Sequence, residues 1–120
     1  MQAKVINKPW GHEIAIANEP AYGAKILMVK KNHRLSLQRH QQRDETWYVI
    51  WGCAIITIGE SVLRYKREEI VQIPRGTWHR LGAEKKDIYV LEVTNGYVEG
   101  DIERKEDDYG REDREESKDS

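Results

Sequence analysis

The tightest constraint on this chain is a rhythm of short β-type runs separated by turn signals. Isoleucine, valine, tyrosine and tryptophan dominate the runs, and Gly, Pro, Asn and Ser stand between them. The spacing is about ten residues, as in an all-β sandwich or barrel, and no long stretch shows helical periodicity. The sequence therefore predicts an all-β fold with strands at residues 12–17, 24–31, 34–38, 45–51, 53–59, 61–66, 69–74, 77–83 and 87–94.

Size and composition favour one domain without a membrane or secretory segment. The 120 residues are 38% hydrophobic and 34% charged, which suits one modest core. No apolar run approaches the roughly 20 residues that cross a bilayer, and the first residues lack the apolar block of a signal peptide. A single cysteine, Cys53, excludes an internal disulfide. We therefore expect a cytoplasmic protein with no membrane partner.

The charge is distributed unevenly along the chain. Residues 101–120 contain ten acidic and five basic residues, whereas the rest contains 11 acidic and 15 basic residues. We expect a barrel domain at residues 1–110 and a charged, disordered tail at 111–120. The mildly cationic body permits an anionic small ligand. It lacks the clustered Lys and Arg of a nucleic-acid-binding protein, so no nucleic-acid partner is expected.

One polar cluster stands where the chain is about to enter a core. In the stretch "RLSLQRHQQRDETW", alternation along a strand places Arg34, Gln38 and His40 on one face. A polar turn follows, and Glu45 opens the next apolar strand. A hairpin of this kind can bring Gln38, His40 and Glu45 together. Because unpaired polar groups are unfavourable in a core, a divalent cation is a reason for such a cluster.

A distant segment offers a fourth ligand. In "IPRGTWHRL", Pro74 and Gly76 form a turn and His79 follows on a new strand. The order Gln-x-His-x4-Glu and then Pro-x-Gly-x-x-His resembles the two motifs of the cupin superfamily. This resemblance implies a double-stranded β-helix, or jelly-roll barrel, with metal ligands Gln38, His40, Glu45 and His79. The chain departs from the common motif at Gln38, where histidine is usual, and at Ala83, where asparagine is usual.

The resemblance extends over most of the chain. The segments "KPWGHE", "RLSLQRHQQRDETWYVIWGCAIITIGE", "IPRGTWHRL" and "LEVTNGYVEGDIERKEDDYGR" resemble the cupin domain of bifunctional type II phosphomannose isomerases. The similarity runs from Lys8 to Arg111 and includes the glutamine at position 38. In that family the cupin domain follows a mannose-1-phosphate guanylyltransferase domain. The present sequence contains only the cupin part, so we expect a stand-alone isomerase-type cupin. One departure is Asn32 and His33, where the family usually has Pro-Gly.

The resemblance implies interconversion of mannose 6-phosphate and fructose 6-phosphate through an enediol-like intermediate. One divalent metal ion would hold the charge that develops on the carbonyl oxygen. Zinc is the expected ion because it has no redox side reactions. The hard amide oxygen of Gln38 also suits manganese or another transition metal. The expected small-molecule partner is therefore a sugar phosphate.

The reaction also needs a base and groups that hold the substrate. Glu92, His33 and Lys25 are the candidate bases. Glu92 lies in the apolar run "YVLEV", where burial would raise the pKa of its carboxyl group; an ion pair with Arg or Lys is the alternative role. Trp47 shares the face of Glu45, so it could stack on a sugar ring or pack in the core.

Arginine side chains suit the phosphate because they form paired hydrogen bonds with it. Arg34 shares the expected ligand face. Arg104 and Arg111 lie in the segment that resembles the family's closing motif, which could fold over the opening. Arg43 and Arg80 adjoin ligands, and we expect them to alternate outward.

Two other functions compete with an isomerase. A cupin could bind or sense a sugar phosphate without turning it over. An iron dioxygenase is the other alternative, although such cupins generally use three histidines and a glutamate, and Gln38 argues against it. Because edge strands need protection, we also expect a homodimer formed by exchanging or abutting edge strands.

Overall fold

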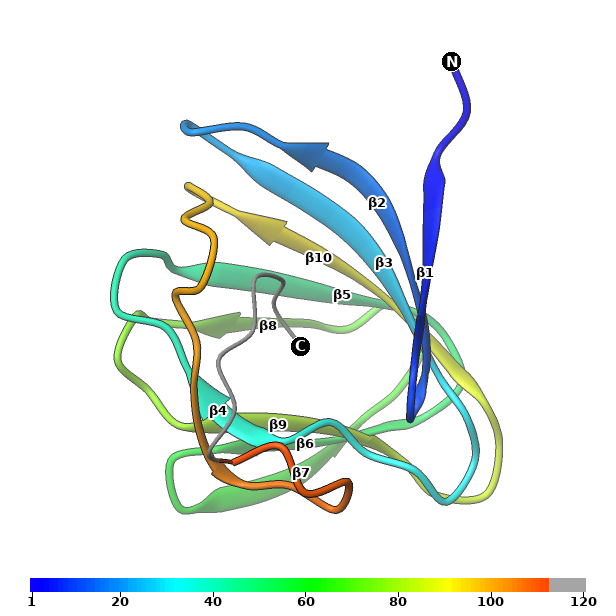
Figure 1. Ribbon diagram of the computed structural model, residues 1–120. Coiled ribbons are helices and arrows are strands. Elements are labelled where there is room, and N and C mark those ends of the chain that lie inside the picture. Colours follow the sequence, from blue (N-terminus) through cyan, green and yellow to red (C-terminus); the bar gives the residue numbers. More distant parts are fainter. Residues whose placement is uncertain (113–120) are drawn as a thin grey trace.

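Two antiparallel sheets face each other and enclose the interior of the protein (Figure 1). The computed structural model describes residues 1–112, and the remainder of the expected tail lies outside this range. The first sheet has the order β1-β2-β3-β10-β5-β8 and the second has the order β11-β4-β9-β6-β7. Among the described residues there is no helix that could span a membrane. The all-β prediction is confirmed.

The strands of the six-stranded sheet are β1 (Lys4–Lys8), β2 (Gly11–Asn18), β3 (Gly23–Val29), β10 (Ile88–Thr94), β5 (Glu45–Trp51) and β8 (Ile70–Ile73). The strands of the five-stranded sheet are β11 (Glu103–Glu106), β4 (Leu37–Arg39), β9 (His79–Ala83), β6 (Ala54–Ile58) and β7 (Ser61–Tyr65).

Every predicted run overlaps a strand, although the run 34–38 shares only residues 37 and 38 with β4, and the structure adds β1 and β11, which the sequence did not indicate. Their sequences, KVINK and ERKE, carry charges at the positions where a half-buried strand would be apolar. Each lies at the edge of its sheet and is held by one neighbour, β2 or β4. Charged residues are typical of edge strands because they discourage further pairing. Hydrophobic alternation alone therefore cannot reveal them.

The interior has an apolar part and a polar part. Alternate residues of β3 point inward, and Leu27 and Val29 join a core that also contains Trp10, Ile88 and Val90. Further along the same strands the inward side chains become polar. Lys25 lies opposite Glu92 across β3 and β10, and Thr94 lies opposite Glu45 across β10 and β5. The register of the six-stranded sheet thus gathers buried polar groups at one end.

Truncation of a core leucine tests the apolar part. Leu81 is fully buried in β9, whereas Leu63 in β7 is more than half exposed. We expect Leu81→Ala to lower the free energy of unfolding by about 2–5 kcal/mol, because it removes buried methyl groups and leaves a cavity. Leu63→Ala is the matched control and should change it by less than about 0.5 kcal/mol. Chemical denaturation measures both; equal losses would contradict the assigned core.

Candidate metal centre

Four side chains from three strands and a loop form the candidate metal centre. Gln38 in β4 and His79 in β9 are register partners, His40 lies just beyond β4, and Glu45 opens β5. Potential ligand atoms of His40, Glu45 and His79 all lie within 4.8 Å of one another. All four side chains are buried. The fold therefore brings together two motifs that are far apart in the sequence.

Each histidine is held so that one ring nitrogen faces the centre. His40 Nδ1 lies 2.6 Å from the carbonyl oxygen of Asp101, and His79 Nδ1 lies 2.9 Å from that of Thr77. A carbonyl oxygen only accepts hydrogen bonds, so each Nδ1 carries the proton and donates it. Each Nε2 then presents a lone pair. Fixing the tautomer in this way is what a metal-binding imidazole requires.

The loop between β4 and β5 is held by the segment that leads to β11. The Asp101 carboxylate accepts hydrogen bonds from the backbone amides of Gln41 and Gln42, both at 3.0 Å. On the other side, the Gly76 amide donates to the His40 carbonyl oxygen at 2.7 Å. Gly76 has a φ of 79°, a left-handed conformation that favours glycine. Residues distant in sequence thus fix the position of His40.

Glu45 is the only carboxylate of this ligand set, and its pKa lies well below the usual range. Burial alone would raise this pKa, but His40 and the Arg43 guanidinium lower it more strongly. Trp47 Nε1 also donates to Glu45 Oε1 at 2.8 Å. Burial lowers the pKa of His79 to about 4, so its imidazole is neutral near pH 7. The ionised Glu45 and the neutral His79 therefore face the same point.

The donor set fits a divalent metal ion. Gln38 Oε1 and His79 Nε2 are buried and have no hydrogen-bond partner within residues 1–112. Such atoms are rare in folded proteins because each loses its contact with water. An ion held by Gln38, His40, Glu45 and His79 would satisfy both. The triad of His40, Glu45 and His79 could hold a metal ion; oxygen and imidazole donors together suit zinc, manganese and several other metals.

Arg43 corrects one expectation from the sequence. It was expected to alternate outward, but it is buried and lies against the ligands. Its Nη2 lies 2.6 Å from Glu45 Oε2, 3.1 Å from His40 Nε2 and 3.9 Å from Glu92 Oε2. Arg43 lies in the loop before β5 and two residues before Glu45, so alternation continued back from Glu45 places it on the inward face. This spacing was the available signal.

Arg80, the other neighbour of a ligand, does turn away from the centre. Its Nε donates to the Leu35 carbonyl oxygen at 2.9 Å and its Nη2 donates to the Glu106 carbonyl oxygen at 3.2 Å. The side chain is nevertheless buried, and it contacts Leu35 and Glu106.

A buried chain of charges continues from Arg43 away from the ligands. Lys25 Nζ lies 2.9 Å from Glu13 Oε2 and 3.7 Å from Glu92 Oε2. Burial, followed by the charge of Glu45, raises the pKa of Glu92 to about 7. Glu92 and Lys25 were predicted site residues, and both lie beside this centre. Glu13 was not predicted as a site residue, although a glutamate at an inward position of an apolar strand was a usable signal.

His33 and Arg34 lie elsewhere, on the outer face of the five-stranded sheet. Arg34 pairs with Asp108 through two hydrogen bonds of 2.8 and 3.0 Å, and the His33 ring stacks on Tyr109. Both line a groove of about 390 Å³ away from the ligands. The expectation that Arg34 shares the ligand face is wrong. Arg34 forms only an isolated bridge with Gly82, and β4 begins at Leu37, so the assumed alternation is interrupted.

The remaining predicted residues have mixed placements. Arg104 is buried, is the register partner of Gln38, and donates from Nε to Ser36 Oγ at 3.2 Å. Arg111 forms a two-pronged ion pair with Asp107. Trp47 is almost completely buried and its ring meets His79 edge-on. Trp47 therefore packs in the core and offers no face to a sugar.

A cavity leads from the surface toward the buried charges. It has a volume of about 210 Å³ and is lined by Lys4, Glu13 and Tyr97, among others. It shares Lys25 and Tyr97 with a space of about 10 Å³ that is also lined by Arg43 and Glu92. The polar end of the interior is thus approached past Lys25 and Tyr97.

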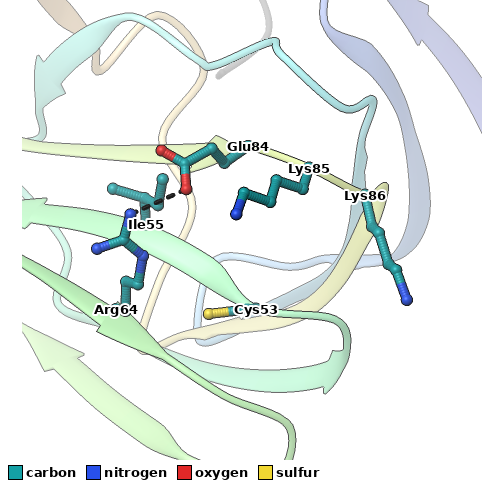
Figure 2. A pocket seen from close by; sticks show the side chains of 6 residues that line it. All are labelled: Cys53, Ile55, Arg64, Glu84, Lys85 and Lys86. Carbon is teal, nitrogen blue, oxygen red and sulfur yellow. Dashed lines mark hydrogen bonds and ion pairs between the residues drawn. The ribbon is translucent and has the colours of Figure 1, made fainter.

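A different pocket, of about 320 Å³, lies around Cys53 and is shown in Figure 2. Arg64 and Glu84 form an ion pair across it at 2.9 Å, with Lys85 nearby. None of the four candidate ligands lines this pocket.

The sequence model described as "Mannose-6-phosphate isomerase C-terminal" matches residues 1–107. The chain belongs to this family. Similar proteins include the xanthan biosynthesis protein XanB of Xanthomonas campestris pv. campestris, 39% identical, and the mannose-1-phosphate guanylyltransferase ManC of Salmonella typhimurium, 37% identical. Each match covers 88% of this chain but 23% of the relative. The chain therefore spans about a quarter of the length of these relatives.

A solved structure identifies the fold of this member of the mannose-6-phosphate isomerase C-terminal family. A cupin-2 domain from Rhodospirillum rubrum superposes with a TM-score of 0.69 at 16% sequence identity, covering 78% of this chain and 69% of that one. The chain is thus an all-β cupin, and the expected fold class is confirmed.

Removal of one imidazole tests the metal centre of this cupin. We expect His79→Ala to weaken the binding of Zn²⁺ or Mn²⁺ by more than about 100-fold, since loss of an outer partner alone typically costs 10–100-fold. His12→Ala, in β2 and outside the ligand set, is the matched control and should bind as the wild type does. Calorimetric titration of metal-free protein measures both; equal affinities would contradict the assignment.

The position of Arg43 generates a second prediction. Its guanidinium donates to Glu45 and contacts His40 Nε2, two groups that would also hold the ion. We expect Arg43→Met to raise the metal affinity by about tenfold, a change of about 1.4 kcal/mol, and to destabilise the metal-free protein. Arg39→Met removes an exposed ion pair with Glu103 and is the control. Weaker metal binding by Arg43→Met would show that the guanidinium supports the ligands instead of competing with the ion.

Proposed function

We propose that this chain is a metal-dependent isomerase that interconverts mannose 6-phosphate and fructose 6-phosphate. The observation that carries the proposal is the convergence of Gln38, His40, Glu45 and His79 beside Glu92, a buried carboxyl group whose pKa is raised to about 7. Membership of the mannose-6-phosphate isomerase C-terminal family supports the same reaction. An aldose–ketose isomerisation needs both an electrophile and a base, and the polar end of this interior offers both.

A metal ion bound here supplies positive charge that stabilises the negative charge developing on the substrate's carbonyl oxygen. The protein's part is to hold the donors in place. The carbonyl oxygens of Asp101 and Thr77 orient the two imidazoles, and Trp47 orients Glu45. Zinc is the proposed ion, and manganese is the alternative because the Gln38 amide oxygen is a hard donor.

Glu92 is the proposed base. With a pKa of about 7, a large share of its carboxyl groups is ionised at neutral pH and can accept a proton. In the direction from mannose 6-phosphate, Glu92 removes the proton from C2 and the electron pair moves to the C1 carbonyl oxygen, which gives an enediolate. The proton of the C2 hydroxyl passes to the C1 oxygen, the C2 carbonyl forms, and Glu92 returns its proton to C1. The carboxyl group ends the cycle as it began, and both the carbon-bound and the oxygen-bound protons balance.

We assign Lys25 the role of positioning Glu92 and not the role of the base. Burial alone would lower the pKa of Lys25, but the charges of Glu92 and Glu13 raise it, so the ammonium group stays protonated. A cation 3.7 Å from Glu92 favours the carboxylate and fixes its position. Arg104, beside Gln38, is the predicted arginine best placed to contact the substrate.

A cupin that binds a sugar phosphate without turnover is the second candidate. The narrow space next to Glu92, about 10 Å³, favours it, because a substrate must widen this space to reach the base.

Turnover and binding assays distinguish the two candidates. Purified protein loaded with Zn²⁺ or Mn²⁺ is expected to convert mannose 6-phosphate to fructose 6-phosphate in a coupled assay, and His79→Ala is expected to be inactive. Full metal occupancy and sugar-phosphate binding without turnover would show that the chain is a binding protein and not an isomerase. Full occupancy with neither binding nor turnover would exclude both.

The role of Glu92 can be tested separately through the pH dependence of the rate. A base works in its ionised form, so kcat/KM is expected to rise with pH through about 7 and then level off. Glu92→Gln should lower kcat by about 10²–10⁴-fold and abolish this rise, while metal content stays unchanged. Glu99→Gln, which lines the outer cavity, is the matched control. An unchanged pH profile in Glu92→Gln would assign the base elsewhere.

A further inference from the structure

Lys25 is shared by two buried carboxyl groups that reach it from the strands on either side. Its Nζ donates to Glu13 Oε2 at 2.9 Å and lies 3.7 Å from Glu92 Oε2. Glu92 is the register partner of Lys25 across β10 and β3. Glu13 reaches Lys25 diagonally from β2, where the register partner of Lys25 is Ala15. A chain of three titratable groups therefore crosses three neighbouring strands.

The two carboxyl groups at the ends of this chain differ in their access to water. Glu13 lines the outer cavity, which has a volume of about 210 Å³. Glu92 lines a space of about 10 Å³, which is at the lower limit for holding one water molecule. Lys25 lines both spaces. Glu13 is therefore better placed than Glu92 to exchange a proton with solvent.

A proton can move between the two carboxyl groups without changing the charge of the buried chain. Once Glu92 has accepted a proton, the chain consists of a carboxyl group, an ammonium group and a carboxylate, and it is neutral. If Lys25 gives a proton to Glu13 while it accepts the proton of Glu92, the same kinds of group remain. The transfer leaves no charge unpaired, and an unpaired buried charge would be strongly unfavourable.

Lys25 remains an ammonium group in such a transfer, as its surroundings require. Burial lowers the pKa of Lys25, but the charges of Glu92 and Glu13 raise it more strongly. A route that needs a lasting neutral lysine is therefore disfavoured, and one in which the lysine gives and accepts a proton together is favoured.

We propose that Glu13 and Lys25 form a proton route between Glu92 and water in the outer cavity. The inference rests on the proposed function, because it takes Glu92 as the base. The proton removed from C2 of the substrate passes from Glu92 to Lys25 as Lys25 gives a proton to Glu13. Glu13 exchanges that proton for one from water, and the reverse transfer brings a solvent proton to Glu92, which delivers it to C1. Each side chain ends as it began, so protons balance.

Isotope tracing measures this route. Protein loaded with Zn²⁺ or Mn²⁺ converts mannose 6-phosphate in D₂O, the reaction is stopped early, and NMR gives the ratio of deuterium to retained hydrogen at C1 of fructose 6-phosphate. Wild type is expected to incorporate deuterium, because exchange competes with direct return of the proton. We expect Glu13→Gln to lower the ratio by about fivefold or more, since an amide accepts a hydrogen bond from Lys25 but does not accept its proton.

Lys25→Arg tests the middle of the route independently. A guanidinium keeps the positive charge between the two glutamates but does not give up its proton in a protein, so the ratio should again fall by about fivefold or more. This variant also replaces Glu13→Gln where circular dichroism shows that the latter is unfolded. Glu99→Gln removes another carboxyl group that lines the outer cavity; it is the matched control and should keep the wild-type ratio.

The ratio is measured within the product, so it can be read from a variant that turns over slowly. Three results would overturn the route: no deuterium in the wild-type product, a folded Glu13→Gln or Lys25→Arg with the wild-type ratio, or an equal fall in Glu99→Gln. A wild-type ratio in the first two variants would show that Glu92 exchanges directly with water. Absence of turnover by the metal-loaded wild type would overturn the proposed function and the route together, whereas turnover with an unchanged ratio would overturn the route alone.

Discussion

Burial of the Glu45 carboxylate between Trp47, Arg43 and His40 is the interaction on which the polar end of this cupin depends. Trp47, Arg43 and His40 all contact its two oxygens. A buried, unpaired carboxylate would be strongly destabilising, so these contacts must form with the fold. A divalent ion bound here would compete with the Arg43 guanidinium for the same Glu45 oxygen, so its binding would change the partners of Arg43.

The two halves of the interior have different roles because of the strand register. One end of β3 and β10 contributes Leu27 and Val90 to the apolar core, and the other contributes Lys25 and Glu92 to the charged chain. The apolar half provides most of the stability through burial. The polar half holds charges that depend on each other. Such a division lets a small protein keep a raised pKa at Glu92 while the surrounding core fixes its position.

The outward and inward faces of the six-stranded sheet are chemically opposite at this end. The inward face contains Glu13, Lys25, Glu92 and Glu45, whereas the outward face of the same strands has no charge. Period-two alternation makes both possible from one sequence. A sheet with charged groups inside and apolar groups outside reverses the usual arrangement of a soluble protein.

The sequence by itself determined the β-rich fold class and the cupin spacing, because alternation and motif spacing can be read along the chain, and it predicted Gln38, His40, Glu45 and His79 as candidate ligands. Only the tertiary structure decided which charges share the interior with those ligands. Arg43 pairs with Glu45, Glu13 pairs with Lys25 across two strands, and Arg34 lies away from the candidate ligands where its strand is interrupted. The sequence pattern also did not indicate the edge strands β1 and β11, because pairing with a neighbouring strand, and not hydrophobicity, holds them in place.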